Sequence, residues 1–149
     1  MKRIETKIQI NATPERIWTI LTELDKYPQW NPFIKSARGK VIEGEKLNVC
    51  IAPPDGKEMC FKPTVLTVKA NAEFRWLGHF LFPGIFDGEH IFIIKGNENG
   101  AFLIQKEIFK GLLVPLIWKS MEKNTKTGFE SMNNALKMRA EGEDRQQPV

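Results

Sequence analysis

The sequence predicts an α+β fold in which a twisted antiparallel sheet wraps around one long helix near the C-terminus. Two observations carry this prediction. Apolar side chains recur every three or four residues over 115–139, which is the spacing of one helical face. Before that stretch, short strand-like segments follow one another with turn residues between them, which is typical of consecutive hairpins. Because the helices are segregated from the strands, the class is α+β, and we expect seven strands.

The composition is that of one globular domain with an excess of apolar rings. The 149 residues are 42% hydrophobic and 27% charged, which is ordinary for a soluble chain. We place the domain at residues 1–141 and expect the polar tail at 142–149 to be loosely ordered. There are 10 Phe and 4 Trp against 1 Tyr. We expect some of these rings to line a pocket rather than to fill the core.

The charge pattern argues against several classes of partner. The net charge is +4, but Lys and Arg are interleaved with Glu, so no basic run tracks phosphates and nucleic-acid binding is not expected. The sequence contains no stretch of about 18 apolar residues, so no membrane span is expected. The basic start Met1-Lys2-Arg3 is followed by Ile4-Glu5-Thr6-Lys7, which is not the core of a signal peptide. We therefore expect a cytoplasmic protein.

Two cysteines lie symmetrically about a turn. Cys50 and Cys60 flank Pro53-Pro54-Asp55-Gly56, so a hairpin there places them opposite one another. A cytoplasmic location favours two reduced thiols over a disulfide. The spacing of the two Cys and two His matches no metal motif, and we expect neither a metal nor a cofactor.

The N-terminal segments are a strand and two short helices. Residues 2–10 alternate apolar and polar side chains, which predicts a half-buried strand. Thr13 suits a helix N-cap and Pro14 the first helical position. Pro28 and Pro32 then forbid a long helix, so we expect a short helical turn or compact loop. The aromatic side chains that this segment turns inward are Tyr27, Trp30 and Phe33.

A succession of strands follows. Pro63 indicates a bulge or an edge position within its strand. Residues 96–100 form a strong turn signal between the last two strands. The loop Leu81-Phe82-Pro83-Gly84 is unusually apolar, and it suits either a cavity lid or a dimer contact. The strands expected after the first are 34–42, 46–52, 58–70, 73–80, 85–95 and 101–110.

The long helix over 115–139 has small side chains at its centre. Pro115 fits the first turn, and about 25 residues at about 1.5 Å each give a length of roughly 37 Å. Thr125 and Gly128 interrupt the apolar stripe, and we expect room for a ligand beneath them. The alternative is that large sheet side chains, such as Trp76, fill that room.

Several segments resemble a known superfamily in order along the chain. These are Asn-Ala-Thr-Pro-Glu-Arg-Ile-Trp (11–18), Tyr-Pro-Gln-Trp-Asn-Pro-Phe (27–33), Gly-Ile-Phe-Asp-Gly-Glu-His-Ile-Phe (84–92), Glu-Ile-Phe-Lys-Gly-Leu-Leu (107–113) and Gly-Phe-Glu-Ser-Met-Asn-Asn-Ala-Leu (128–136). Together they are similar to the polyketide cyclase/dehydrase-like branch of the START/Bet v 1 (SRPBCC) superfamily, over residues 1–141.

This resemblance implies a helix-grip fold, with a hydrophobic cavity between a curved sheet and the C-terminal helix. It implies lipid, polyketide, sterol or aromatic ligands. It does not imply one reaction, because function varies widely within such folds. The polar pocket residues of the bacterial cyclases and aromatases have no residue-by-residue match here, so the resemblance assigns no catalytic role.

One pair of residues offers acid–base chemistry. Strand alternation turns His90 and Phe92 inward on one strand, and Gln105, Glu107 and Phe109 inward on the next. With the hairpin centred near residue 98, His90 falls close to Glu107 or Gln105. A buried His beside a buried Glu suits proton transfer. The weightier alternative is that the two groups only satisfy each other or orient a ligand.

The expected function is binding of a small hydrophobic or amphipathic molecule under the long helix. The alternatives are a cyclase, dehydratase or hydrolase that uses His90 and Glu107, and a homodimeric module joined through the apolar loop. Any single aromatic residue is more often plain core than pocket lining. The candidate ligand-binding residues are Trp30, Phe33, Trp76, Phe80, Phe92, Gln105, Phe109, Met121, Thr125, Gly128 and Met132.

Overall fold

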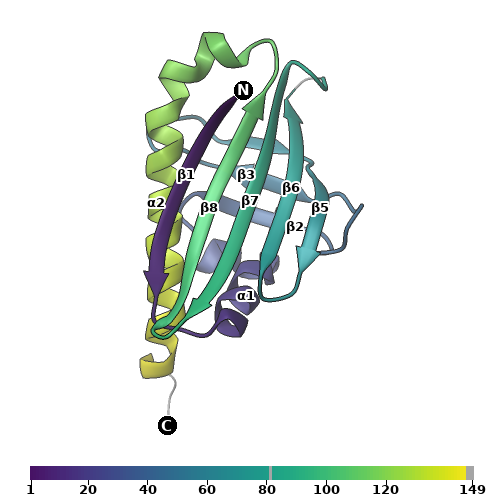
Figure 1. Ribbon diagram of the computed structural model, residues 1–149. Coiled ribbons are helices and arrows are strands. Elements are labelled where there is room, and N and C mark those ends of the chain that lie inside the picture. Colours follow the sequence, from purple (N-terminus) through teal and green to yellow (C-terminus); the bar gives the residue numbers. More distant parts are fainter. Residues whose placement is uncertain (81, 147–149) are drawn as a thin grey trace.

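The computed structural model describes residues 1–80 and 82–146, which form two antiparallel sheets and three helices (Figure 1). The larger sheet has five strands, in the order β1 (Lys2–Ile10), β8 (Gly100–Lys110), β7 (Phe86–Asn97), β6 (Glu73–Phe80) and β5 (Thr64–Lys69). The smaller sheet has three, in the order β2 (Ile34–Arg38), β3 (Asn48–Ile51) and β4 (Met59–Phe61). The helices are α1 (Pro14–Thr22), the 3₁₀ helix η1 (Leu24–Gln29) and α2 (Val114–Gln146).

The arrangement is the α+β fold that the sequence predicts. The long helix α2 runs along the β1 edge of the larger sheet, and the smaller sheet lies behind that sheet (Figure 1). Side chains from both sheets, from α1 and from α2 meet in one apolar cluster. The core therefore lies between the layers, and the inner face of the larger sheet is the face that carries the candidate residues.

The strand count differs from the predicted seven because the segment at 58–70 is two strands rather than one. Pro63 lies between β4 and β5, and it has no N–H to donate to a ladder. Its carbonyl instead accepts from the Leu47 N–H at 2.9 Å. Pro63 thus marks the point where the chain passes from the smaller sheet to the larger. The strands expected at 34–42 and 46–52 are shorter, as β2 and β3.

The short helices form as their sequence signals predict. The Thr13 hydroxyl accepts from the Arg16 N–H at 3.1 Å, and Pro14 occupies the first turn of α1. η1 follows directly and ends at Gln29. The aromatic side chains of this region are buried (Tyr27 and Phe33) or half-buried (Trp30).

The two halves of α2 pack differently. The second half buries a continuous stripe on the core, namely Thr125, Gly128, Phe129, Met132, Asn133, Leu136 and Ala140. Over 114–124 only Val114 is buried, while Trp118 and Met121 are half-buried. The helix starts one residue before the predicted Pro115 and continues past residue 139 to Gln146. Of the tail expected to be loose at 142–149, residues 142–146 are helical, and 147–149 lie outside the described residues.

The small residue at the centre of α2 accommodates a ring from another segment. A Cβ added to Gly128 would meet Cδ1 of Phe33, with Cε1 only 2.6 Å away. Phe33 is 3% exposed and contacts Phe129 edge-on at 5.6 Å. The interpretation of Gly128 as the roof of a ligand cavity is therefore wrong. The alternative, that large sheet side chains such as Trp76 fill the room, is right that the space is filled, but the ring beneath Gly128 is that of Phe33, which precedes β2 and is not a sheet residue.

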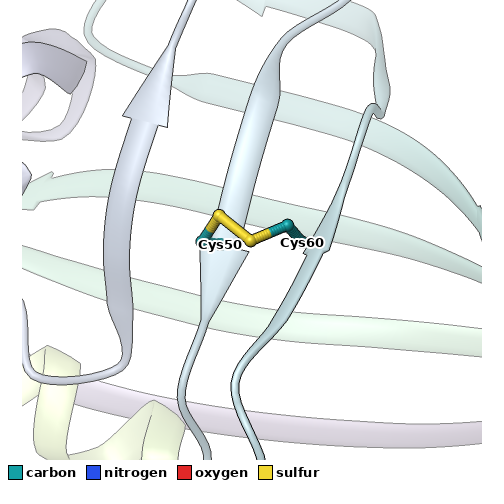
Figure 2. Close-up of a disulfide and its surroundings, with 2 residues drawn as sticks. All are labelled: Cys50 and Cys60. Atoms are coloured by element: carbon teal, nitrogen blue, oxygen red, sulfur yellow. A yellow bond between two sulfur atoms is a disulfide. The ribbon is translucent and has the colours of Figure 1, made fainter.

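Cys50 and Cys60 face each other across β3 and β4, as their symmetric placement predicts (Figure 2). Their sulfurs are bonded in a disulfide. The expectation of two reduced thiols is wrong because it rested on an assumed compartment, whereas the strand register brings the two Cα atoms to 4.0 Å. The bridge closes a hairpin at the edge of the smaller sheet.

We expect the disulfide to stabilise the fold. The cross-link spans a sequence separation of 10, and closing a loop of that size in the unfolded chain is worth about 2–3 kcal/mol. Denaturant unfolding of the Cys50→Ala/Cys60→Ala variant should show this loss. Reductant should lower the stability of the unaltered protein to that of the variant and leave the variant unchanged. Free thiols found in the denatured, unreduced protein would contradict the bridge.

We expect Gly128→Ala to destabilise the protein despite the better helix propensity of Ala. The added methyl must displace the Phe33 ring from a packed core, which costs about 1–3 kcal/mol. Gly142 in the same helix has nothing within 4 Å of an added Cβ, so Gly142→Ala serves as the matched control and should be neutral or stabilising. Equal unfolding free energies for the two variants would mean that the space beneath Gly128 is open.

Candidate functional site

A chain of buried polar side chains joins the larger sheet to α2. Gln105 of β8 donates from Nε2 to Oδ1 of Asn133 at 2.7 Å and to the Phe129 carbonyl at 3.4 Å. Asn133 donates from Nδ2 to the Thr6 hydroxyl at 2.8 Å, and that hydroxyl donates to the Gln105 carbonyl at 3.0 Å. None of Thr6, Gln105 and Asn133 is more than 8% exposed. Each group therefore needs its partner, because nothing else in the core can satisfy it.

The same chain continues on the sheet to a His and a Glu. His90 of β7 and Glu107 of β8 are direct cross-strand partners, and Phe92 is the partner of Gln105. Nε2 of His90 lies 2.9 Å from Oε1 of Gln105. Nδ1 of His90 lies 3.3 Å from Oε1 of Glu107. The sequence predicts that His90 is close to Glu107 or Gln105, and the structure places it in contact with both.

The hydrogen bonds decide which nitrogen of His90 carries a proton. The Phe129 carbonyl can only accept, so the Gln105 amide must turn its NH₂ group toward α2 and its oxygen toward His90. Nε2 of His90 must then be protonated to donate to that oxygen. Nδ1 of His90 faces Oε1 of Glu107 at 3.3 Å, so the second ring nitrogen is directed at a carboxyl group with which it could exchange a proton.

Aromatic rings enclose the imidazole, whereas the carboxyl is only partly covered. His90 is 4% exposed, and its ring centroid lies 4.6–5.1 Å from those of Trp76, Phe92 and Phe129. The Glu107 side chain is 18% exposed. It lies over Gly88, where any Cβ would collide with its carboxyl oxygen. Glycine at this position of β7 makes room for a carboxylate on the inner face.

Sequence reasoning found three of the five polar side chains of this network. Alternation within β7 and β8 and the turn between them indicate His90, Gln105 and Glu107. Thr6 and Asn133 were not among the candidates. Thr6 lies on the buried face of β1, and Asn133 is a polar residue within the apolar stripe of α2, so a polar side chain at a buried position is the signal that points to both.

Most of the candidate ligand-binding residues belong to the packed core. Trp30 and Met121 are half-buried. Phe80 does not line the interior: it is 48% exposed near the end of β6, beyond the part of the sheet that the other layers cover. The buried candidates are Phe33, Trp76, Phe92, Gln105, Phe109, Thr125, Gly128 and Met132.

Two open hollows lie on the surface of the described part of the chain. One is lined by Asp25, Pro28 and residues 36–38. The other is lined by residues 11–13, Arg16 and residues 98–100. Neither involves α2 or a candidate ligand-binding residue, so both are separate from the polar network.

One cluster brings possible metal ligands together. Sulfur atoms of Cys50 and Cys60 and a carboxylate oxygen of Glu58 lie within 4.8 Å of one another. Both sulfurs are bonded in the disulfide, so the cluster offers no thiolate as it stands.

No helix in the described part of the chain is both long and apolar enough to cross a membrane.

Comparisons with solved structures agree on the fold. A START superfamily protein from Mycobacterium smegmatis matches with a TM-score of 0.72 at 21% identity, covering 94% of this chain and 97% of that one. An AHSA1-like protein from Aeromonas hydrophila matches with a TM-score of 0.70 at 13% identity, covering 99% and 98%. The di-domain ARO/CYC protein StfQ from the steffimycin biosynthetic pathway matches with a TM-score of 0.76 at 12% identity, covering 95% of this chain and 51% of that one.

These likenesses establish the helix-grip fold, and the resemblance noted in the sequence is confirmed. Comparison with curated proteins gave no match. The sequence itself matches, over residues 1–141, the family described as polyketide cyclase / dehydrase and lipid transport. The chain therefore belongs to the polyketide cyclase/dehydrase and lipid transport family.

Proposed function

We propose that the protein binds a small apolar or amphipathic molecule between the larger sheet and the first half of α2, with the polar group of that molecule against Glu107. The observation that carries this proposal is the partly exposed carboxyl at the end of an otherwise buried polar chain. Its contact with His90 leaves lone pairs of the carboxyl unused, and because the side chain is 18% exposed they can accept a hydrogen bond from a bound molecule or from water.

The surroundings of Glu107 suit an amphipathic ligand. Phe109 is on the same face of β8, and its ring lies 5.7 Å from that of Phe86 and 5.6 Å from that of Trp118. Met121 follows one turn after Trp118 and is half-buried, and a Met side chain adapts to irregular shapes. An apolar wall with one convergent polar group is the usual composition of a small-molecule site. We therefore place the ligand site against the more loosely packed turns at 114–124 of α2, and not beneath Thr125 and Gly128.

The chemistry of Glu107 narrows the ligand class. A carboxylate accepts hydrogen bonds, so it favours a hydroxyl, amine or amide N–H on the ligand and disfavours a second carboxylate. The family description includes polyketide cyclisation and lipid transport. A hydroxylated lipid or polyketide-like molecule meets both conditions.

A second candidate function is acid–base catalysis on the bound molecule, by the pair His90 and Glu107. The specific observation in its favour is the contact of 3.3 Å between Nδ1 of His90 and Oε1 of Glu107. A group that can hold or release a proton beside a ligand suits the dehydration or cyclisation of a polyketide-like chain.

The cytoplasmic location stays a prediction, and the disulfide weighs against it, because structural disulfides persist mainly in oxidising compartments. A homodimer joined through the loop at 81–84 also stays an alternative. Phe82 of that loop is 71% exposed, whereas Leu81 lies outside the described residues.

We expect ligand binding to depend on Trp118. A neutral fluorescent probe, N-phenyl-1-naphthylamine, should bind the purified protein, and Trp118→Ala should weaken its affinity about tenfold because a large apolar contact is lost. Met138 in the same helix is 74% exposed, so Met138→Ala is the control and should bind as the unaltered protein does. Native mass spectrometry of protein purified from its own host should reveal a co-purified molecule that Trp118→Ala loses. Equal probe affinity in both variants would refute the site.

We expect Glu107→Gln to separate binding from catalysis. The amide keeps the size of the side chain but cannot take up the proton, so turnover of the co-purified molecule should fall about 10²–10⁴-fold if the pair is catalytic. Affinity for the neutral probe should change far less. If turnover is absent in the unaltered protein, or if turnover and affinity fall together, the pair serves binding or structure alone.

A further inference from the structure

At one end of the molecule β6 ends, β7 begins and β8 passes into α2 (Figure 1). Several large apolar side chains of these segments are exposed. Phe82 in the β6–β7 loop is 71% exposed, and Leu112 and Leu116 are 77% and 79% exposed. Phe80 and Ile117 are 48% and 37% exposed. We call these five residues the apolar end. Exposed apolar side chains scattered singly need no explanation, but a cluster of them marks a surface of interaction.

The apolar end is held in place by backbone hydrogen bonds. The N–H groups of Leu112 and Leu113 donate to the carbonyls of Gly84 and Ile85, each at 3.0 Å, and so join the β6–β7 loop to the start of α2. The exposed side chains of both segments therefore belong to one surface, and their exposure is built into the fold.

A side-chain clamp fixes the same loop. Asp87 accepts from the Gly84 N–H with both carboxyl oxygens, at 3.2 and 3.0 Å, and lies 2.7 Å from Nδ1 of His79. Burial alone would raise the pKa of Asp87, but the hydrogen bonds from His79 and Gly84 outweigh it and hold that pKa below its ordinary value. Asp87 is thus an ionised group already engaged within the loop.

Cations surround the apolar end. Lys2 is the register partner of Phe109, and Lys110 that of Asp87, so both lie where β8 approaches the loop. On α2, Lys119 and Lys123 follow Leu116 by three and seven residues, on the same side of the helix. Over residues 114–126 the one acidic side chain is Glu122, against three lysines. The rim of the apolar end therefore carries net positive charge.

Exposed apolar side chains with lysines around them favour one kind of partner for the apolar end over another. A symmetric dimer formed through it would place the same patch of both copies together, so the lysines at its rim would face lysines. An anionic bilayer accepts protruding apolar side chains at its interface and attracts cations at its surface, each Lys near the surface contributing about 1 kcal/mol. The charge complementarity favours the bilayer over a second copy.

We propose that the apolar end docks on an anionic lipid surface, with Phe82, Leu112 and Leu116 entering the interface and Lys2, Lys110 and Lys119 contacting the headgroups. The docking surface is an outer face of the protein, so the proposal stands whether or not a ligand binds beside Glu107. If such a ligand does bind, the docked face is the one next to the loosely packed turns of α2, and the ligand can be exchanged with the membrane directly.

The test is co-sedimentation of the full chain with vesicles. Vesicles of phosphatidylcholine with about 30% phosphatidylglycerol should retain the protein, and pure phosphatidylcholine vesicles should retain much less. Raising the salt to about 0.5 M should release it, since the charge contacts are exposed and screened. Phe82→Ser/Leu112→Ser should lower partitioning about tenfold or more. Both side chains are largely exposed, so circular dichroism should show an unchanged fold.

Two matched controls separate this surface from general stickiness. Met138 and Lys35 are exposed and belong to other parts of the chain, so Met138→Ser and Lys35→Glu should bind vesicles normally, whereas Lys119→Glu should bind them less. The proposal is overturned if the unaltered protein does not bind anionic vesicles, or if the double variant binds these vesicles as strongly as the control variants do. It is also overturned if light scattering shows a dimer that the double variant dissociates while vesicles bind neither protein, since the occupant is then a second copy.

Discussion

The hydrogen bond from Gln105 to Asn133 is the interaction on which the rest of this structure depends. It is the point at which the polar groups of the larger sheet meet those of α2, in a core that is otherwise aromatic and aliphatic. Its direction is set by the Phe129 carbonyl, which can only accept and so turns the NH₂ group of Gln105 toward α2. An isolated polar group in such a core would cost several kcal/mol, whereas a complete chain specifies one position of the helix on the sheet. The register between helix and sheet is thus fixed by polar contacts within an apolar interface.

The half of α2 that is N-terminal to this junction packs less closely than the second half. The second half presents a full buried stripe, with Gly128 shaped to the Phe33 ring. The first half offers Trp118 and Met121 only partly buried, and the Trp118 ring contacts that of Phe109. The close packing that stabilises the fold is therefore concentrated in the second half of the helix, and the first half is the part in which the proposed site would find local freedom.

Local patterns predicted the parts of the fold that depend on local chemistry. Alternation, the turn at 96–100 and the cap at Thr13 each act over a few residues, and from them the strands, α1 and the pairing of His90 with Glu107 follow. What the sequence could not supply is the identity of partners from distant segments. The small size of Gly128 indicates that something lies close to the helix, but only the structure shows that it is Phe33. The role of Asn133 likewise depends on which turn of α2 faces Thr6. The facing of Cys50 and Cys60 was predicted, but the choice between thiols and a disulfide rested on an assumed compartment. The change of sheet at Pro63 depended on two strand partners far apart in the chain.

The direction of the buried hydrogen bonds has a consequence for proton movement. From His90 onward each side chain donates to the next, through Gln105 and Asn133 to the Thr6 hydroxyl, which ends on a backbone carbonyl. Amide groups cannot pass a proton along without changing their covalent form, and the Gln105 amide cannot reverse without losing its bond to the Phe129 carbonyl. The chain is therefore an insulator and not a proton wire. Any proton that His90 and Glu107 exchanged would have to pass through the carboxyl, which is the end of the chain that is partly open to the surroundings.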